Sequence, residues 1–236
     1  MNQLDPDSSV VLLSGGMDST TLFYEAMVEH NVVAALSFDY GQRHVTELGY
    51  AERTAAKFNV EHQVISLRDV TKFLTGSALT DPGVEVPHGH YAEDNMRVTV
   101  VPNRNMMMLS IAAAIAIGLN AESVWAAMHA GDHPVYPDCR PGFISQLNTT
   151  LRFATETTVK VWTPYINIGK DEIVRIGARL GVPYEETWSC YEGGNVHCGR
   201  CGTCVERAEA FHLAGVSDPT LYQDPDYWKS AVGVDT

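Results

Sequence analysis

The chain has 236 residues and a formal net charge of −13, from 16 Lys and Arg against 29 Asp and Glu. Its length allows one large domain or one domain with a small appendage, and its 45% apolar content is typical of a globular protein. Because a surface that grips nucleic acid or an anionic membrane needs clustered Lys and Arg, the acidic balance argues against both partners.

The first nine residues are polar and acidic, without the apolar stretch of a secretory leader. The most apolar stretch, residues 106–119, is shorter than the roughly 20 residues that span a membrane. We therefore expect a buried helix there and a soluble, cytoplasmic protein.

Apolar runs alternate with helical patterns along the chain. Buried strands are expected at residues 10–13, 32–38, 63–67, 123–128 and 159–164. Helices are expected at residues 19–29, 46–58, 104–119, 142–155, 170–180 and 205–214. This alternation predicts an α/β fold, with a parallel sheet and helices on both of its faces.

Three segments fall outside the alternation. Residues 75–96 are rich in Gly, Pro and His, and such a long irregular stretch is usually functional or mobile, so we expect a long loop or a lid. Residues 129–141 are a second irregular segment. The tail from Ser217 is expected to pack as an extended segment.

The string Ser14-Gly-Gly-Met-Asp-Ser19 follows the first strand and opens the first helix. The N–H groups of a first helical turn lack internal partners and attract phosphate, and Ser14, Ser19 and Thr20 add hydroxyl groups. The string lacks the Lys of a Walker A loop and the third Gly of a dinucleotide fingerprint. Two glycines alone would also fit an ordinary strand–turn–helix joint, and Asp18 would also fit a helix N-cap.

The full string resembles the pyrophosphate loop of the N-type ATP pyrophosphatases. That resemblance implies a Rossmann-like sheet of the adenine nucleotide α-hydrolase type and ATP cleavage between the α and β phosphates. It also implies Mg²⁺ bound with ATP, held by Asp18 through water. The ATP-binding residues implied are Leu13, Ser14, Gly15, Gly16, Met17, Asp18, Ser19, Thr20, Thr21, Leu22 and Phe23.

Four of the five cysteines, Cys190, Cys198, Cys201 and Cys204, fall within 15 residues. Cys-x2-Cys turns suit tetrahedral zinc, and four thiolates close the shell, so a structural Zn²⁺ site is predicted. Disulfides and an iron–sulfur cluster are the alternatives. His197 is interpreted as a bystander. The fifth cysteine, Cys139, is interpreted as a buried structural thiol, with a nucleophilic role as the alternative.

Three more strings combine a cation with hydrogen-bonding groups on loops: residues 38–44, 101–105 and 136–140. The first follows the second expected strand, so it lies at the edge of the sheet where open α/β proteins bind ligands. Each string alone would also fit a loop stabilised by an Arg–Asp pair.

Taken in order with Thr187-Trp-Ser-Cys-Tyr191 and the cysteine cluster, these strings resemble the 7-cyano-7-deazaguanine synthase family over residues 10–218. The chain departs from the family pattern at Asn103, at Pro134 and Val135, and at Gly202 and Thr203, which bears on the shape of the substrate pocket. The resemblance implies an ATP-dependent ligase that converts 7-carboxy-7-deazaguanine and free ammonia into the nitrile, through adenylated acid and amide intermediates, releasing AMP and pyrophosphate. It also implies a homodimer.

Roles follow from the resemblance as hypotheses. The catalytic residues expected are Asp18, Ser19, Arg104, Arg140 and Lys170. The substrate-binding residues expected are Asp39, Tyr40, Gln42, Arg43, Arg104, Asp138 and Arg140. An ATP pyrophosphatase domain is expected over residues 1–184 and a zinc-binding segment over residues 185–236. The alternatives are an enzyme that stops at the amide or attaches the base to a partner, and a non-catalytic nucleotide-binding module.

Overall fold

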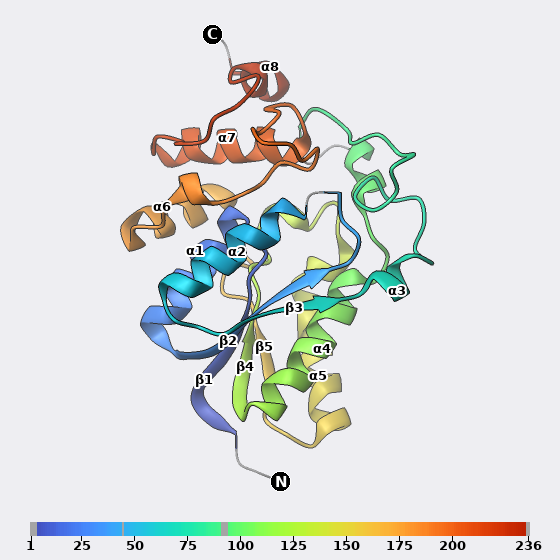
Figure 1. The fold of residues 1–236 in the computed structure, drawn as a ribbon, viewed down its shortest axis with the longest axis vertical. Coiled ribbons are helices and arrows are strands. Elements are labelled where there is room, and N and C mark those ends of the chain that lie inside the picture. Colours follow the sequence, from blue (N-terminus) through green and yellow to red (C-terminus); the bar gives the residue numbers. More distant parts are fainter. Residues whose placement is uncertain (1–3, 44, 91–93, 235–236) are drawn as a thin grey trace.

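A computed structural model describes residues 4–43, 45–90 and 94–234. Its centre is a parallel sheet of five strands in the order β3-β2-β1-β4-β5 (Figure 1). The strands are β1 (Asp5–Leu12), β2 (Asn31–Asp39), β3 (His62–Ser66), β4 (Ala121–Trp125) and β5 (Lys160–Trp162). The predicted parallel α/β sheet is therefore confirmed.

Helices lie on both faces of this sheet and across one end of it (Figure 1). They are α1 (Met17–Glu29), α2 (Thr46–Lys57), α3 (Arg68–Thr71), α4 (Arg104–Gly118), α5 (Pro141–Thr155), α6 (Lys170–Leu180), α7 (Gly202–Ala214) and α8 (Tyr227–Val232). Short 3₁₀ turns are η1 (Asp94–Thr99), η2 (Ala130–Asp132), η3 (Pro137–Cys139) and η4 (Tyr184–Glu186).

Neighbouring residues of β1 point to opposite faces, as the pleat of a strand requires. Val10 packs in a cluster with Leu109 of α4 and Leu147 of α5. Val11 packs in another cluster with Phe23 of α1 and Ile173 of α6. One face of the sheet is thus covered by α4 and α5, and the other by α1, α2 and α6.

The chain after α6 lies across the end of the sheet where the strands finish, with α7 resting on α1 and α6 and α8 beyond it (Figure 1). The tail was expected to be extended, but it contains α8. This helix ends at Gly233 in the left-handed conformation, and the ring of Trp228 packs against His212 of α7 at 5.1 Å. The proposed division at residue 184 stays a prediction.

The helix α4 is the expected apolar helix. Residues 96–118 are apolar enough by composition to cross a membrane, but Val101 and Pro102 separate η1 from α4 within them. Leu109, Ala112 and Ala116 are buried against the sheet. This burial is that of a core helix rather than a lipid-facing one.

The turn between β1 and α1 depends on Gly15. Its φ is +86°, and a Cβ atom there would lie 2.1 Å from the backbone oxygen of Glu47 in α2. Its carbonyl oxygen accepts a hydrogen bond of 2.8 Å from the Trp188 N–H. Only glycine therefore lets β1, α2 and the segment around Trp188 meet at this point.

We predict that Gly15→Ala lowers the free energy of unfolding by about 3 kcal/mol or more, because it adds a backbone clash to the cost of a left-handed alanine. Gly181→Ala is the matched control: its φ is +71°, but no atom lies within 4 Å of the added Cβ. That control should lose only about 1 kcal/mol. Urea denaturation measures both, and equal losses would contradict the clash.

Candidate active site

A cavity of about 280 Å³ opens at the carboxyl ends of β1, β2 and β4. The chain passes from β1 to β2 on one side and β4 lies on the other, so this is the point where the strand order reverses, and open α/β sheets bind ligands there. Predicted residues that line it are Leu13, Ser14, Gly16, Met17, Asp18, Ser19, Tyr40, Arg104 and Lys170.

One end of the cavity is formed by the turn before α1. The Ser14 N–H donates to Ser19 Oγ at 3.1 Å, the two hydroxyls lie 2.9 Å apart, and Ser19 Oγ also contacts the Gly16 carbonyl. No side chain caps the helix, and Gly16 occupies its N-cap position. The first-turn N–H groups therefore face a cavity lined by hydroxyl groups, which suits a phosphate.

Asp18 does not act as the N-cap that was considered as an alternative. Its Oδ2 lies 3.2 Å from Lys170 Nζ, and its Oδ1 is buried without a hydrogen-bond partner among the described residues. A buried carboxylate oxygen without a donor is costly unless a cation or water joins it. Its donor set suits a hard cation such as Mg²⁺.

Lys170 begins α6 and is 11% exposed. Its Nζ lies 2.5 Å from Glu206 Oε2 in α7, as well as near Asp18. Burial lowers the pKa of this lysine, but Asp18, Glu206 and Asp132 together raise it above its ordinary value. Lys170 is therefore a positive charge held beside the turn before α1, and its expected contact with phosphate stays a prediction.

Three further polar residues surround Asp18 and Lys170 and were not predicted from the sequence: His129, Asp132 and Glu206. His129 is 2% exposed, accepts the Gly131 N–H at Nδ1, and has its Nε2 at 3.6 Å from Asp132 and 3.9 Å from Asp18. Its place shortly after β4 was the available signal. Glu206 carried none, because it is 36 residues from Lys170 along the chain.

A second part of the cavity lining is built around Arg104, at the start of α4. Its Nη1 donates to the Tyr40 hydroxyl at 3.2 Å, and its guanidinium lies 5.2 Å from the centre of the Tyr40 ring. Burial raises the pKa of Tyr40 to about 12 although Arg104 lowers it, so the phenol keeps its proton. Asn105 and Tyr191, which belong to the predicted strings but had no role assigned from the sequence, also line the cavity.

Burial lowers the pKa of Arg104, but its neighbours, chiefly Tyr40, Tyr136 and Tyr191, raise it above its ordinary value overall. Among the described residues, no carboxylate pairs with Arg104, whose guanidinium instead forms a hydrogen bond and a cation–π contact with Tyr40. A charged guanidinium facing a cavity in this way can bind a carboxylate or phosphate through two parallel hydrogen bonds.

Other predicted substrate residues do not line the cavity. The carboxylate of Asp39 forms an ion pair with Arg68. The Gln42 amide accepts the Tyr40 N–H and donates to Glu47. The Arg43 guanidinium donates to the carbonyl of Asp81. Asp138 accepts the N–H of Asn105, and the exposed Arg140 donates to the carbonyl of His133. These side chains shape the loops around the cavity, and their substrate contacts stay predictions.

The predicted ATP-binding residues also separate into those that line the cavity and those that do not. Gly15, Thr20, Thr21, Leu22 and Phe23 lie behind the cavity surface. Leu22 and Phe23 pack in the core. The Thr21 hydroxyl donates to the Met17 carbonyl and lies 3.1 Å from the Tyr184 hydroxyl. They support the loop from behind.

The expected lid is held to the body in the part described. The guanidinium of Arg43 bonds to the carbonyls of Asp81 and Val84, and Leu79 is buried. No residue from 75 to 90 lines the main cavity. Residues 91–93 of the expected lid lie outside the described residues, so the lid stays a prediction.

Cys139 lines the cavity but is 5% exposed, and its sulfur accepts a hydrogen bond of 3.2 Å from the amide of Asn105. Burial and the carboxylates of Asp132 and Asp138 raise the pKa of the thiol well above its ordinary value. Because the thiolate is the nucleophile, this environment favours the structural interpretation.

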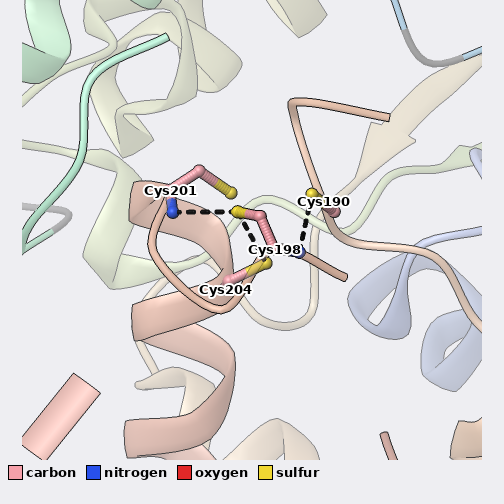
Figure 2. A group of neighbouring side chains, drawn as sticks. All are labelled: Cys190, Cys198, Cys201 and Cys204. Atoms are coloured by element: carbon pink, nitrogen blue, oxygen red, sulfur yellow. Dashed lines mark hydrogen bonds between the residues drawn. The ribbon is translucent and has the colours of Figure 1, made fainter. Parts of the chain in front are cut away.

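Cys190, Cys198, Cys201 and Cys204 form one buried group, whose sulfur atoms all lie within 4.8 Å of one another (Figure 2). None forms a disulfide. The N–H groups of Arg200 and Cys201 point to Cys198 Sγ, at 3.3 and 3.2 Å. Four sulfurs at this spacing could hold one metal ion.

Tetrahedral zinc with Zn–S bonds of about 2.3 Å places its sulfurs about 3.8 Å apart, close to the 4.0 Å between Cys198 and Cys204. An iron–sulfur cluster would separate the sulfurs further, because its inorganic core lies between them. His197 binds the N–H of Ser189 instead, and burial and the nearby Arg207 lower its pKa to about 4. Its interpretation as a bystander fits these contacts.

The cysteine group also supports the cavity. Thr203, one residue before Cys204, donates to the Ser189 carbonyl at 2.7 Å. The fully buried Arg207 donates to Thr187, Ser189 and the Tyr184 carbonyl. Trp188 and Ser189, held in this way, line the cavity beside the turn before α1, where the Trp188 N–H donates to the Gly15 carbonyl.

The sheet order, the glycine turn and the cavity at the carboxyl ends of the strands define an α/β protein of the pyrophosphate-loop class. The structure of NMN synthetase from Francisella tularensis has a similar fold, with a TM-score of 0.51, 15% identity and coverage of 95% of this chain and 84% of that chain.

The family model described as "Queuosine biosynthesis protein QueC" matches residues 8–215, and the chain belongs to this family. The chain is 54% identical to the 7-cyano-7-deazaguanine synthase of Sinorhizobium fredii over 94% of this chain and 95% of that protein. It is 53% identical to the enzyme of the same name from Brucella anthropi, over 95% and 97%. The chain is thus an enzyme, a ligase that forms carbon–nitrogen bonds.

We predict that Cys201→Ser removes the bound metal and lowers the thermal midpoint by about 10 °C or more, since metal binding contributes folding free energy. Cys139→Ser is the control, because Cys139 lies outside the cysteine group, and it should keep its metal. Elemental analysis and calorimetry measure both. Equal metal content in the two variants would refute the four-cysteine site.

Proposed function

We propose that the chain converts 7-carboxy-7-deazaguanine and ammonia to 7-cyano-7-deazaguanine with two molecules of ATP. The acid is adenylated and pyrophosphate leaves, and ammonia then displaces AMP to give the amide. Adenylation of the amide oxygen and loss of AMP leave the nitrile. The observation that carries the proposal is one cavity that is lined both by the glycine turn before α1 and by Arg104.

The pyrophosphate of ATP would lie against the turn before α1. Its negative charge is met there by the first-turn N–H groups, by the hydroxyls of Ser14 and Ser19, and by Lys170. Because charge on the pyrophosphate grows as the bond to the α phosphorus breaks, groups held in place beforehand favour the transition state.

Asp18 would hold Mg²⁺, which neutralises phosphate charge when bound. The buried, unpartnered Oδ1 of Asp18 supports this assignment. Lys170 Nζ, at 3.2 Å from the other carboxylate oxygen of Asp18, would hold that carboxylate at the cavity surface, with His129 Nε2 further away at 3.9 Å. The cysteine group would hold Zn²⁺ with a closed shell and a structural role.

The acid substrate would lie at the Arg104 end. The guanidinium can form two parallel hydrogen bonds with the carboxylate, and the rings of Tyr40 and Tyr191 supply flat apolar surface for a purine-like base. This arrangement would direct the carboxylate toward the α phosphorus, because positioning of two reactants accounts for much of such a rate enhancement.

A homodimer and a cytoplasmic location belong to this proposal through the family resemblance. The partners proposed are ATP, the deazaguanine acid and ammonia, with neither nucleic acid nor a membrane. Size-exclusion chromatography with light scattering checks the dimer.

Incubation with 7-carboxy-7-deazaguanine, ATP, Mg²⁺ and ammonium should give the nitrile and two AMP per nitrile, measured by mass spectrometry and nucleotide chromatography. The amide as final product would refute the proposed nitrile product. AMP release only with a different acid would refute the proposed substrate.

In the same assay, Ser19→Ala, which removes the hydroxyl bonded to Ser14, should lower turnover at least about tenfold.

Arg104→Met should raise the KM for the acid substrate about 10- to 100-fold, because a hydrogen-bonded charge pair contributes roughly 1.5–3 kcal/mol. Arg140→Met is the matched control, since Arg140 is exposed and bonded to a backbone carbonyl. It should stay within about threefold of the unmodified enzyme. Steady-state kinetics decide between them, and the reverse order would move the carboxylate site to Arg140.

A further inference from the structure

Glu206 is a buried carboxylate that does not line the main cavity. It lies on α7, two residues after the cysteine Cys204, and its side chain is 11% exposed. Its Oε2 lies 2.5 Å from Lys170 Nζ, and its Oε1 lies 2.9 Å from the position a Cβ atom would take at Gly131. Gly131 thus leaves room for a carboxylate that reaches across from α7 to α6.

The location of Lys170 makes such a carboxylate necessary. Lys170 is the first residue of α6, and the N-terminus of a helix carries partial positive charge that disfavours a cation. It is also buried, which disfavours an ammonium group further. Two carboxylates offset both effects: Asp18 at 3.2 Å, on the side of the cavity, and Glu206 on the opposite side.

A lysine between two carboxylates is held differently from a lysine with one. The lysine stem has many rotamers, and fixing it costs about 1.5–2 kcal/mol of conformational entropy. With Asp18 alone, the ammonium would move fully onto that carboxylate, and the pair would neutralise itself. Glu206 holds Nζ from the other side, so the ammonium keeps one position between the two carboxylates instead of collapsing onto Asp18.

We propose that Glu206 is a positioning residue: through Lys170 it sets the place where the departing pyrophosphate is held. This rests on the proposed function, which puts pyrophosphate at the turn before α1. Glu206 is two residues along α7 from Cys204, so the segment that carries the four-cysteine group would also orient a charge beside the turn before α1.

A double-mutant cycle tests the proposal with magnesium pyrophosphate as the probe. Glu206→Gln should raise its dissociation constant about tenfold, measured by isothermal titration calorimetry. The kcat should fall about tenfold or more, while the KM for the acid substrate stays within about twofold. In a Lys170→Met background, Glu206→Gln should change the affinity by less than about twofold, because residues that act through one contact are not additive.

Glu209→Gln is the matched control. Glu209 lies on the same helix and contacts His90 at 3.6 Å, so its substitution should leave pyrophosphate affinity within about twofold. If Glu206→Gln behaves like this control, the proposal is wrong. Equal losses from Glu206→Gln in the unmodified enzyme and in the Lys170→Met background would show a role in α7 packing instead, and would also overturn it.

Lys170→Met leaves Glu206 buried without its partner, so that single variant could fail to fold. Lys170→Met/Glu206→Gln carries no uncompensated charge at this pair, and its thermal midpoint should exceed that of Lys170→Met. If Lys170→Met does not fold, Glu206→Asp replaces it: the retained charge should recover part of the pyrophosphate affinity that Glu206→Gln loses, and no recovery would overturn the proposal.

The pyrophosphate measurement needs neither the acid nor ammonia, which separates this proposal from the proposed reaction. An enzyme that makes only the amide but binds pyrophosphate through Lys170 and Glu206 would contradict the proposed product and leave the role of Glu206 standing. An unmodified enzyme with no affinity for magnesium pyrophosphate would overturn both.

Discussion

The close approach of three segments at Gly15 is the constraint on which the rest of the site depends. Its missing Cβ lets the backbone of α2 lie against the turn, and its carbonyl binds the N–H of Trp188. A larger residue would push α2 away and displace Trp188 and Ser189, which line the cavity. The turn before α1 is therefore shaped as much by its neighbours as by its own sequence.

Charge is arranged around this turn in a way that the net charge of −13 makes important. Because the overall field repels ATP, positive potential has to be supplied locally by a few fixed groups. Lys170 sits at the turn between the carboxylates of Asp18 and Glu206, and Arg104 lines the same cavity beside Tyr40. The proposed function assigns the phosphates to Lys170 and the acid to Arg104.

Much of the fold was predictable because local patterns decide it. The predicted helix over residues 170–180 matches α6, from Lys170 to the left-handed Gly181, and the parallel sheet was expected from alternation alone. The start of β1 was missed because residues 5–9 are mostly polar, yet Ser8 and Ser9 are buried by pairing with β2 and β4. In the candidate site, Ser14 and Asp18 belong to the predicted loop string and Lys170 begins a predicted helix, whereas Glu206 belongs to no local pattern and His129 is marked only by its place after β4.

The sequence by itself determined the family, the order of elements, the glycine turn and the four cysteines, since each of these is a property of neighbouring residues. Only the tertiary structure decided which charges face the cavity. Arg104 lines it and Arg140 turns to a carbonyl of its own loop, although both belong to similar loop strings. Glu206 meets Lys170 because α7 folds back across α6, a contact between residues distant in sequence that only packing of the whole chain can create.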